Sequence, residues 1–191
     1  MKIEEVKLGN QLEKSISLDT TKGTLFVMTG INGSGKSTLF KMIMKLVPIK
    51  SGQIIFEEEM TYVPDPAENY FIGLTPLVYF NILQENMKIS SEKFKEKLSL
   101  FSKILNFPSQ LYSHQIKMLS LGEKRKVMII GAFLMDKALM LLDEPFAGLD
   151  KESCLNLINL IDEERLRGKK FFIITHEKKE LLKDIDQHIV L

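Results

Sequence analysis

The sequence predicts an α/β protein with a mainly parallel sheet, an antiparallel β region at the N-terminus and a small helical insertion. Short runs of β-type residues, separated by polar or glycine-containing turns, fill the first third of the chain. From Leu121 onward, helical and strand patterns alternate, which is typical of parallel sheets. Between these parts, residues 64–120 contain Pro64, Pro66 and Pro76 and then apolar residues at helical spacing, which indicates inserted helices.

The strand-rich first third and the helical insertion contain the first predicted strands and helices. The expected strands are Lys2–Leu8, Ser15–Asp19, Leu25–Met28, Gln53–Phe56 and Met60–Val63. Within the insertion, Ser91–Leu105 is expected to be a helix, because its apolar residues recur every three or four positions, at Phe94, Leu98, Phe101 and Leu105.

The last third supplies the remaining elements of the predicted sheet. In chain order we expect a helix from Leu121 to Met135, a buried strand at Ala138–Leu142, a helix at Lys151–Arg167, a strand at Lys170–Thr175, a helix at Lys178–Lys183 and a strand at His188–Leu191. No repeat and no long linker divides the sequence, so residues 1–191 are expected to form one domain with a helical subdomain at about 64–120.

Composition excludes several classes of protein. The 191 residues carry 26 basic and 25 acidic side chains, so the net charge of +1 provides no overall field to attract nucleic acid, and no nucleic-acid partner is expected. No apolar stretch approaches the ~18 residues of a membrane-spanning helix, and the first residues lack the apolar core of a signal peptide. We therefore expect a cytoplasmic protein whose single cysteine, Cys154, is a buried thiol.

The segment from Gly30 to Thr38 is the strongest motif. It matches a glycine, four free positions and then Gly-Lys-Ser/Thr, and it lies between an apolar strand and a predicted helix, which is the context that phosphate-binding loops require. A turn that only joins strand to helix would explain the glycines but not Lys36-Ser37. The expected ligand-binding residues are Asn32, Gly33, Ser34, Gly35, Lys36, Ser37 and Thr38, with Lys36 on the β/γ-phosphates and the Ser37 hydroxyl on Mg²⁺.

A second candidate site follows the apolar strand Ala138–Leu142. Asp143 and Glu144 stand at its carboxyl end, where parallel sheets bind their ligands. Asp143 is expected to bind Mg²⁺, directly or through water. Glu144 is expected to act as general base or to position water for attack on a γ-phosphate. An ordinary turn remains the alternative for this pair alone, and the phosphate loop favours the catalytic interpretation.

With these motifs the chain resembles the nucleotide-binding subunits of ATP-binding cassette (ABC) proteins, over nearly its whole length from about Ile3 to Leu191. Ala147-Gly148-Leu149-Asp150 resembles the family's D-loop, and this resemblance implies that Asp150 is among the cofactor-binding residues. Asp150 also suits a helix N-cap, which is the alternative. His176, one step beyond the strand ending at Thr175, resembles the switch histidine that touches the γ-phosphate. A lone histidine is more often structural, so the role of His176 is assigned from its place after a strand in a chain that already has both phosphate motifs.

Leu119-Ser120-Leu121-Gly122-Glu123 matches the family's signature, Leu-Ser-Gly-Gly-Gln, in part. The resemblance implies that Ser120 and Gly122 contact the γ-phosphate of ATP held by a partner subunit; a simply capped basic helix is the alternative. Leu121 and Glu123 depart from the usual glycine and glutamine. This variant is similar to that of bacterial exporter cassettes.

Two further departures concern ligand contacts. Residues 1–25 contain no aromatic residue to stack on adenine, as the family usually provides. Pro64 or Asp65, depending on the alignment, replaces the glutamine of the family's Q-loop, and Asp65 could reach Mg²⁺ through water. The segment 66–71 is similar to the corresponding loop of energy-coupling-factor cassettes, which indicates import, whereas the signature indicates export.

The resemblance implies a fold and a mode of action. The fold is that of a P-loop NTPase of the ABC ATPase type, and the cofactors are ATP and Mg²⁺. The expected partners are a second ABC ATPase subunit, in a homodimer or heterodimer, and an integral membrane transport subunit. The chain itself is expected to be peripheral on the inner face of the cell membrane. A docking groove for the membrane subunit could involve Pro66, Tyr70, Phe71, Tyr79 and Phe80, which could equally be core or turn residues. A soluble ABC-type ATPase or an ATP-dependent switch is the alternative function.

Overall fold

The computed structural model describes residues 1–8, 15–56, 58–65, 70–87, 89–176 and 179–191. In this part of the chain the strands form a three-stranded antiparallel sheet in the order β2-β1-β4 and a five-stranded sheet in the order β5-β6-β7-β3-β8. The strands are β1 (Lys2–Lys7), β2 (Ser15–Asp19), β3 (Leu25–Thr29), β4 (Gln53–Ile55), β5 (Met60–Val63), β6 (Leu139–Asp143), β7 (Lys170–Ile174) and β8 (Gln187–Val190). All neighbours in the larger sheet pair in parallel, so the predicted fold class is confirmed.

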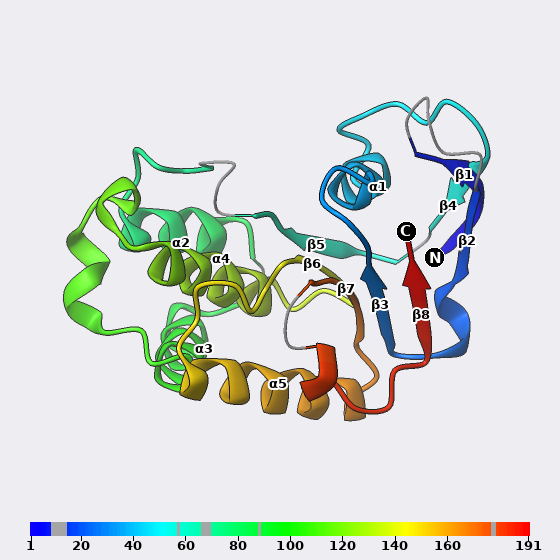
Figure 1. Ribbon diagram of the computed structural model, residues 1–191. Helices are drawn as coiled ribbons and strands as arrows, with labels where there is room; N and C mark the ends of the chain where they lie inside the picture. The colour runs from blue at the N-terminus through cyan, green and yellow to red at the C-terminus, as the bar shows by residue number, and fades with distance from the viewer. Residues whose placement is uncertain (9–14, 57, 66–69, 88, 177–178) are drawn as a thin grey trace.

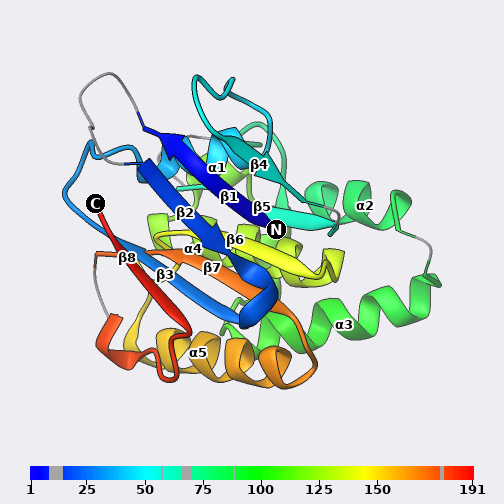
Figure 2. The ribbon, with the colours of Figure 1, turned by 90° about the vertical axis from the view of Figure 1, so that its right-hand side faces the viewer.

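The helices cover both faces of the parallel sheet (Figures 1 and 2). They are α1 (Lys36–Ile43), α2 (Pro76–Glu85), α3 (Ser91–Ile104), α4 (Leu121–Met135) and α5 (Lys151–Leu166). Phe26 and Phe172 lie in the cluster that joins one face to α1 and the antiparallel sheet. Val27 and Phe171 lie in the cluster that joins the other face to α4 and α5. Because successive strand residues point to opposite faces, these apolar runs fill two cores at once.

The helical region packs beside the sheet rather than continuing it (Figure 1). Thr75 caps α2 and Ser90 caps α3, each by accepting a hydrogen bond from a main-chain N–H, and both helices pack against α4. The predicted helix Ser91–Leu105 agrees with α3 to within one residue. Two short 3₁₀ turns, η3 (Ser109–Ser113) and η4 (Ile116–Met118), then lead into α4. Among the described residues, no helix combines the length and apolarity needed to cross a bilayer.

The segment after β7 differs from its prediction. The expected helix Lys178–Lys183 is only the 3₁₀ turn η5 (Lys179–Leu181), and Lys178 lies outside the described residues. The chain must turn back at once to pair β8 with β3. Arg165 holds this turn by donating to the carbonyls of Lys183 and Asp184. Tertiary hydrogen bonds therefore take the place of a longer helix.

Candidate nucleotide-binding site

The loop between β3 and α1 has the geometry of an anion-binding loop. Gly35, the N-cap of α1, has a φ of 95°, and a Cβ at this position would lie 2.9 Å from Cβ of Leu8. Only glycine adopts this conformation readily and tolerates the approach. The first N–H groups of α1 have no partner within the helix, so they form a positive end suited to a phosphate.

Lys36 lies over this loop. Its side chain is largely buried, and Nζ donates to the carbonyls of Gly30 at 2.9 Å and Ile31 at 2.8 Å. The hydroxyl of Ser34 lies 3.5 Å from the same nitrogen. Burial lowers the pKa of Lys36, while the charges of Glu144 and Asp143 act in the opposite direction. The ammonium is thereby held between the loop and the carboxylates at the carboxyl end of β6.

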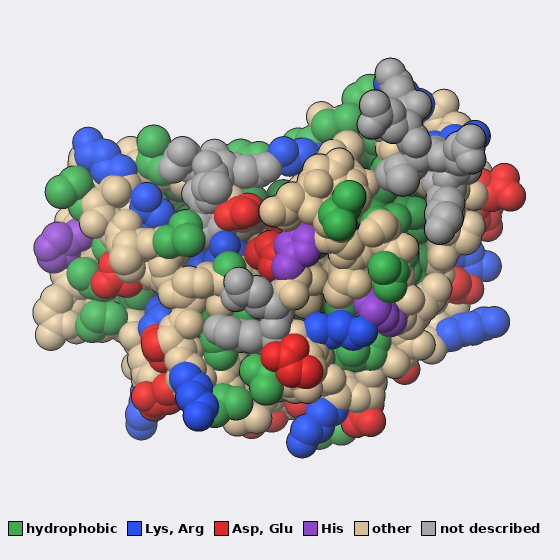
Figure 3. Space-filling view, in the orientation of Figure 1, with side chains coloured by type: hydrophobic (Ala, Val, Ile, Leu, Met, Phe, Trp, Pro, Cys, Tyr) green, Lys and Arg blue, Asp and Glu red, His purple; other side chains and the backbone are tan. Residues whose placement is uncertain are grey.

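A cavity of about 230 Å³ brings most of the predicted residues together. The predicted residues that line it are Asn32, Gly33, Gly35, Lys36, Ser37, Thr38, Asp143, Glu144 and His176. Figure 3 shows acidic and histidine side chains meeting near the middle of this face, between the helical region and the part that carries α1. The cavity thus joins the glycine loop to the carboxyl ends of β6 and β7.

Glu144 is held in an unusual main-chain conformation just beyond β6. Its φ is 48°, in the left-handed region that costs most residues free energy and that clusters at functional sites. Its N–H donates to the carbonyl of Ile174 at 2.9 Å, and its Oε2 accepts from the N–H of His176 at 3.1 Å. Burial raises the pKa of Glu144, opposed by that hydrogen bond and by nearby cations. These contacts fix the carboxylate at the cavity wall.

Asp143 and His176 flank Glu144. Asp143 is the last residue of β6 and is only 1% exposed. Strand β7 ends at Ile174, one residue earlier than predicted, and Thr175 continues the pairing by donating to the carbonyl of Met28. Nε2 of His176 lies 3.4 Å from Oε1 of Glu144. The backbone of β7 therefore places the imidazole beside the Glu144 carboxylate.

Ser120 and Gly122 lie outside this cavity, at the start of α4. Ser120 caps the helix, and its side chain and that of Glu123 form a reciprocal capping box with the main-chain N–H groups. A Cβ on Gly122 would lie 2.2 Å from the carbonyl oxygen of Gly148. Close packing within one chain thus already requires glycine at position 122.

Asp150 also lies outside the cavity. It caps α5 by accepting from the N–H of Ser153 at 2.7 Å, and its other oxygen lies 3.0 Å from Nζ of Lys126. The hydrogen bonds from Ser153 and Lys126 lower the pKa of Asp150. Its carboxylate is therefore engaged in joining α4 to α5.

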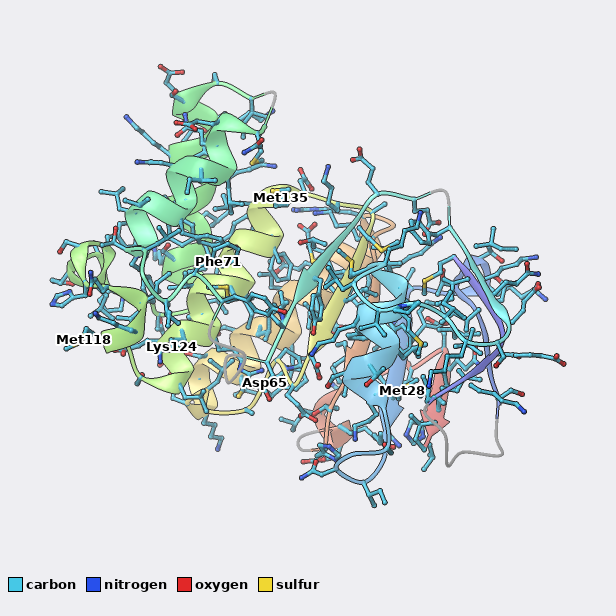
Figure 4. The ribbon with its side chains drawn as sticks, turned by 90° about the horizontal axis from the view of Figure 1, so that it is seen from above. Met28, Asp65, Phe71, Met118, Lys124 and Met135 are labelled. Carbon is cyan, nitrogen blue, oxygen red and sulfur yellow. The ribbon has the colours of Figure 1, made fainter. Side chains whose placement is uncertain are left out.

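Two residues beyond the predicted site residues belong to the site: Asp65 lines the cavity, and Arg125 contacts residues that line it. Asp65, rather than Pro64, lines the cavity, and Figure 4 shows it between the helical region and α1. Arg125 of α4 is 1% exposed and contacts Asp65, Asp143 and Glu144. The sequence placed Arg125 only in a basic stretch. Its position in the predicted helix could have indicated that Arg125 is buried, because Met128 and Ile129 follow three and four residues later on the same buried side.

The aromatic residues proposed for docking divide into two groups. Phe80 is fully buried and Tyr79 is 9% exposed, so their assignment to a docking groove is wrong and they are core residues. Tyr70 and Phe71 are 40% and 49% exposed, and Pro66 lies outside the described residues. Helix α2 instead exposes Leu77, Val78 and Ile82. The amphipathic character of α2 explains why Tyr79 and Phe80 are buried, since the side of the helix that carries them packs on α4.

Comparisons with known proteins identify the family to which the chain belongs. A family model described as ABC transporter matches residues 13–147. The zinc import ATP-binding protein ZnuC of Vibrio vulnificus is 32% identical over 178 residues, which are 93% of this chain and 66% of that protein. The cytochrome c biogenesis ATP-binding export protein CcmA of Reclinomonas americana is 31% identical over 196 residues, with 95% of this chain and 86% of that protein covered.

A solved structure shows the same fold. It is described as the ATP-binding subunit of an ABC transporter, has a TM-score of 0.84 and 23% identity, and the match covers the whole of this chain and 85% of that one. One of the two relatives is named for import and the other for export, so their names assign no common direction. The matched motifs, the family model and the curated relatives together show that the chain belongs to the ABC transporter family, as one of its ATP-binding ATPase subunits.

Proposed function

We propose that this chain binds ATP with Mg²⁺ in the described cavity and hydrolyses it to power a transporter whose membrane part is a separate protein. The observation that carries the proposal is the cavity itself, which brings the glycine loop, Asp143, Glu144 and His176 together. The chain would form a single cassette over residues 1–191, with its helical subdomain at about 64–120. ATP-driven dimerisation with a second cassette would couple hydrolysis to transport.

The oxygen atoms at the cavity suit a magnesium ion. Ser37 offers a hydroxyl and Asp143 a carboxylate, and both line the same cavity. Mg²⁺ prefers oxygen ligands and usually takes few from the protein when phosphates supply others. When bound, the ion would neutralise charge on the phosphates. Asn32, Gly33, Ser34, Gly35 and Thr38 would bind the phosphates around it, through the loop and the first turn of α1.

Glu144 is the proposed general base. A carboxylate whose pKa is raised by burial takes a proton from water more readily than an ordinary one. The N–H of His176 orients its Oε2, and the imidazole beside it is positioned to contact the γ-phosphate. Lys36 would leave the loop carbonyls for the β/γ-phosphates. Positioning and charge stabilisation, rather than covalent chemistry, would supply the catalysis.

A second cassette would complete the site. Ser120 and Gly122 lie at the start of α4 and do not line the nucleotide cavity of their own chain. We propose that they contact the γ-phosphate held by another copy or by a different cassette, and that Asp150 acts at the same interface by holding the D-loop. The half-exposed side chain of Leu121 lies between Ser120 and Gly122 and would face the same partner.

An integral membrane subunit is the proposed second partner, which would hold this chain at the inner face of the membrane. The apolar surface formed by Tyr70, Phe71, Leu77, Val78 and Ile82 would receive it. This surface begins a few residues after Asp65, so docking would act directly on the segment that leaves the nucleotide cavity. A soluble ABC-type ATPase or ATP-dependent switch is the competing function.

The test compares wild type with Glu144→Gln. With Mg²⁺ and ATP, the variant is expected to bind nucleotide as tightly as wild type, lose about 100-fold or more of its turnover, and persist as a dimer in size-exclusion chromatography. Glu163→Gln, the same change at an exposed residue of α5, is the matched control and should behave as wild type. Unchanged turnover in Glu144→Gln would contradict the proposed role of Glu144.

The transport function is tested with the same variant. Purified from its native membranes in ATP and Mg²⁺, Glu144→Gln is expected to retain a polytopic membrane protein. Recovery of the chain alone, of ribosomes or of DNA would support the soluble ATPase or switch instead.

A further inference from the structure

Arg125 carries a buried charge that the proposed chemistry does not use. It lies in the second turn of α4 and is only 1% exposed. A guanidinium removed from water is costly unless it is fully engaged in hydrogen bonds or ion pairs. Its contacts therefore indicate what this position does.

The contacts join three parts of the chain. One terminal nitrogen of Arg125 donates to the main-chain carbonyl of Asp143 at 2.9 Å and also to that of Glu144. The other terminal nitrogen lies 3.4 Å from Oδ1 of Asp65. Asp65 follows β5, and Asp143 and Glu144 stand at the end of the neighbouring strand β6. Arg125 thus connects α4 to the carboxyl ends of both strands.

These hydrogen bonds hold the main chain of Glu144, which has a strained conformation. Glu144 has a φ of 48°, and its N–H is already bonded to the carbonyl of Ile174. With Arg125 on its carbonyl, the peptide groups on both sides of the Glu144 Cα are held. Such strained conformations persist only when the surroundings fix them. The direction of the Glu144 side chain follows from that fixed main chain.

We propose that Arg125 is a positioning residue, which holds the main chain of Asp143 and Glu144 in the geometry for hydrolysis and is itself oriented by Asp65. The inference rests on the proposed function of Glu144. Because α4 also packs against α2 and α3, a displacement of the helical region would reach the carboxylates through the Arg125 side chain. Asp65, one of the two residues that could replace the family's usual glutamine, would then serve to orient Arg125.

Lysine cannot reproduce these contacts. The planar guanidinium presents several N–H groups in a fixed arrangement, whereas an ammonium is a compact point charge on a flexible stem. Arg125→Lys therefore keeps the positive charge while losing the simultaneous bonds to two carbonyls and to Asp65. A misplacement of about 1 Å in a reacting group can cost about 100-fold in rate.

The experiment measures kcat for ATP hydrolysis, and separately the Kd for ATP by titration, in Arg125→Lys. We expect kcat to fall about 10- to 100-fold while Kd stays within about threefold, because the phosphate loop is untouched. Asp65→Asn should lower kcat in the same direction. The double variant should lose less than the product of the two single losses, because both changes remove one contact.

Arg165→Lys is the matched control. Arg165 likewise donates to two main-chain carbonyls, those of Lys183 and Asp184, and pairs with a carboxylate, but it lies away from the cavity. It is expected to lower thermal stability while leaving kcat unchanged. Thermal unfolding of all variants separates a loss of positioning from a loss of fold. Asp65→Asn tests the inference independently if Arg125→Lys fails to fold.

Wild type and Glu144→Gln are assayed beside these variants. If wild type hydrolyses ATP, Glu144→Gln does not, and Arg125→Lys keeps wild-type kcat, the inference is overturned while the proposed function stands. If folded Asp65→Asn keeps wild-type kcat, the orienting role of Asp65 is overturned. Absence of ATP hydrolysis in wild type would overturn the proposed function, and the inference with it.

Discussion

Gly122 is expected to resist substitution for a reason that lies within a single chain. Its Cα faces the main chain of the segment that follows Glu144. A Cβ added at Gly122 would lie 2.2 Å from the carbonyl oxygen of Gly148, well inside the 3.4–4 Å of ordinary van der Waals contact. Because the obstacle is main chain rather than a flexible side chain, Gly122→Ala must push the start of α4 away from that segment.

Two effects of opposite sign determine how much Gly122→Ala changes the free energy of unfolding. Overpacking in a closely packed region typically costs about 1–3 kcal/mol. Replacing glycine with alanine inside a helix returns up to about 1 kcal/mol through helix propensity. We expect Gly122→Ala to lower the free energy of unfolding by about 1–2 kcal/mol. For a chain of this length that corresponds to a Tm lower by roughly 3–6 °C.

Urea unfolding without nucleotide, followed by circular dichroism, is the appropriate assay, since it excludes any contribution from ATP or from a partner. Gly73→Ala is the control, because no atom lies within 4 Å of a Cβ at that position. It should be neutral or slightly stabilising. A Gly122→Ala variant as stable as wild type would refute the packing argument and leave ligand contact as the reason for glycine at this position.

Two further predictions concern a charge network and the signature segment. Partial burial alone would raise the pKa of Asp136, but hydrogen bonds from Lys169 and Lys97 lower it from 3.8 to about 2. Asp136→Asn should therefore lower stability at pH 7 by at most about 1 kcal/mol, since the side chain is nearly half exposed. Urea titrations should show this difference fading as the pH falls from about 4 to about 2; a constant difference would exclude the charge as its cause. The double change Leu121→Gly and Glu123→Gln should raise ATPase turnover of the dimer, because it removes the half-exposed side chain at the start of α4 and glutamine still completes the capping box. Unchanged turnover would make these departures from the usual signature neutral.

Local pattern was sufficient for most elements of the fold. Continuous apolar runs in Leu25–Thr29 and Leu139–Asp143 mark strands that are buried on both faces, and the spacing of apolar residues in the helical region marks α3. The prediction of a helix at Lys178–Lys183 was wrong, because hydrogen bonds from Arg165, which is distant in sequence, hold a turn there. Such contacts cannot be predicted from the pattern of apolar and polar residues within the segment whose conformation they determine.

The sequence by itself determined the chemistry of the candidate site. Few kinds of site combine a glycine loop followed by Lys36 and Ser37 with a strand that ends in Asp143 and Glu144. These patterns are recognised by the spacing of their residues along the chain, so no tertiary contact is needed to find them.

Only the tertiary structure decided how these groups are held. It placed Phe80 in the core rather than on a docking surface, showed that Gly148 requires glycine at position 122, and brought Arg125 to the carbonyls of Asp143 and Glu144. The physical reason is that burial and main-chain hydrogen bonds between distant segments depend on how the helices pack on the sheet, which spacing along one segment does not encode.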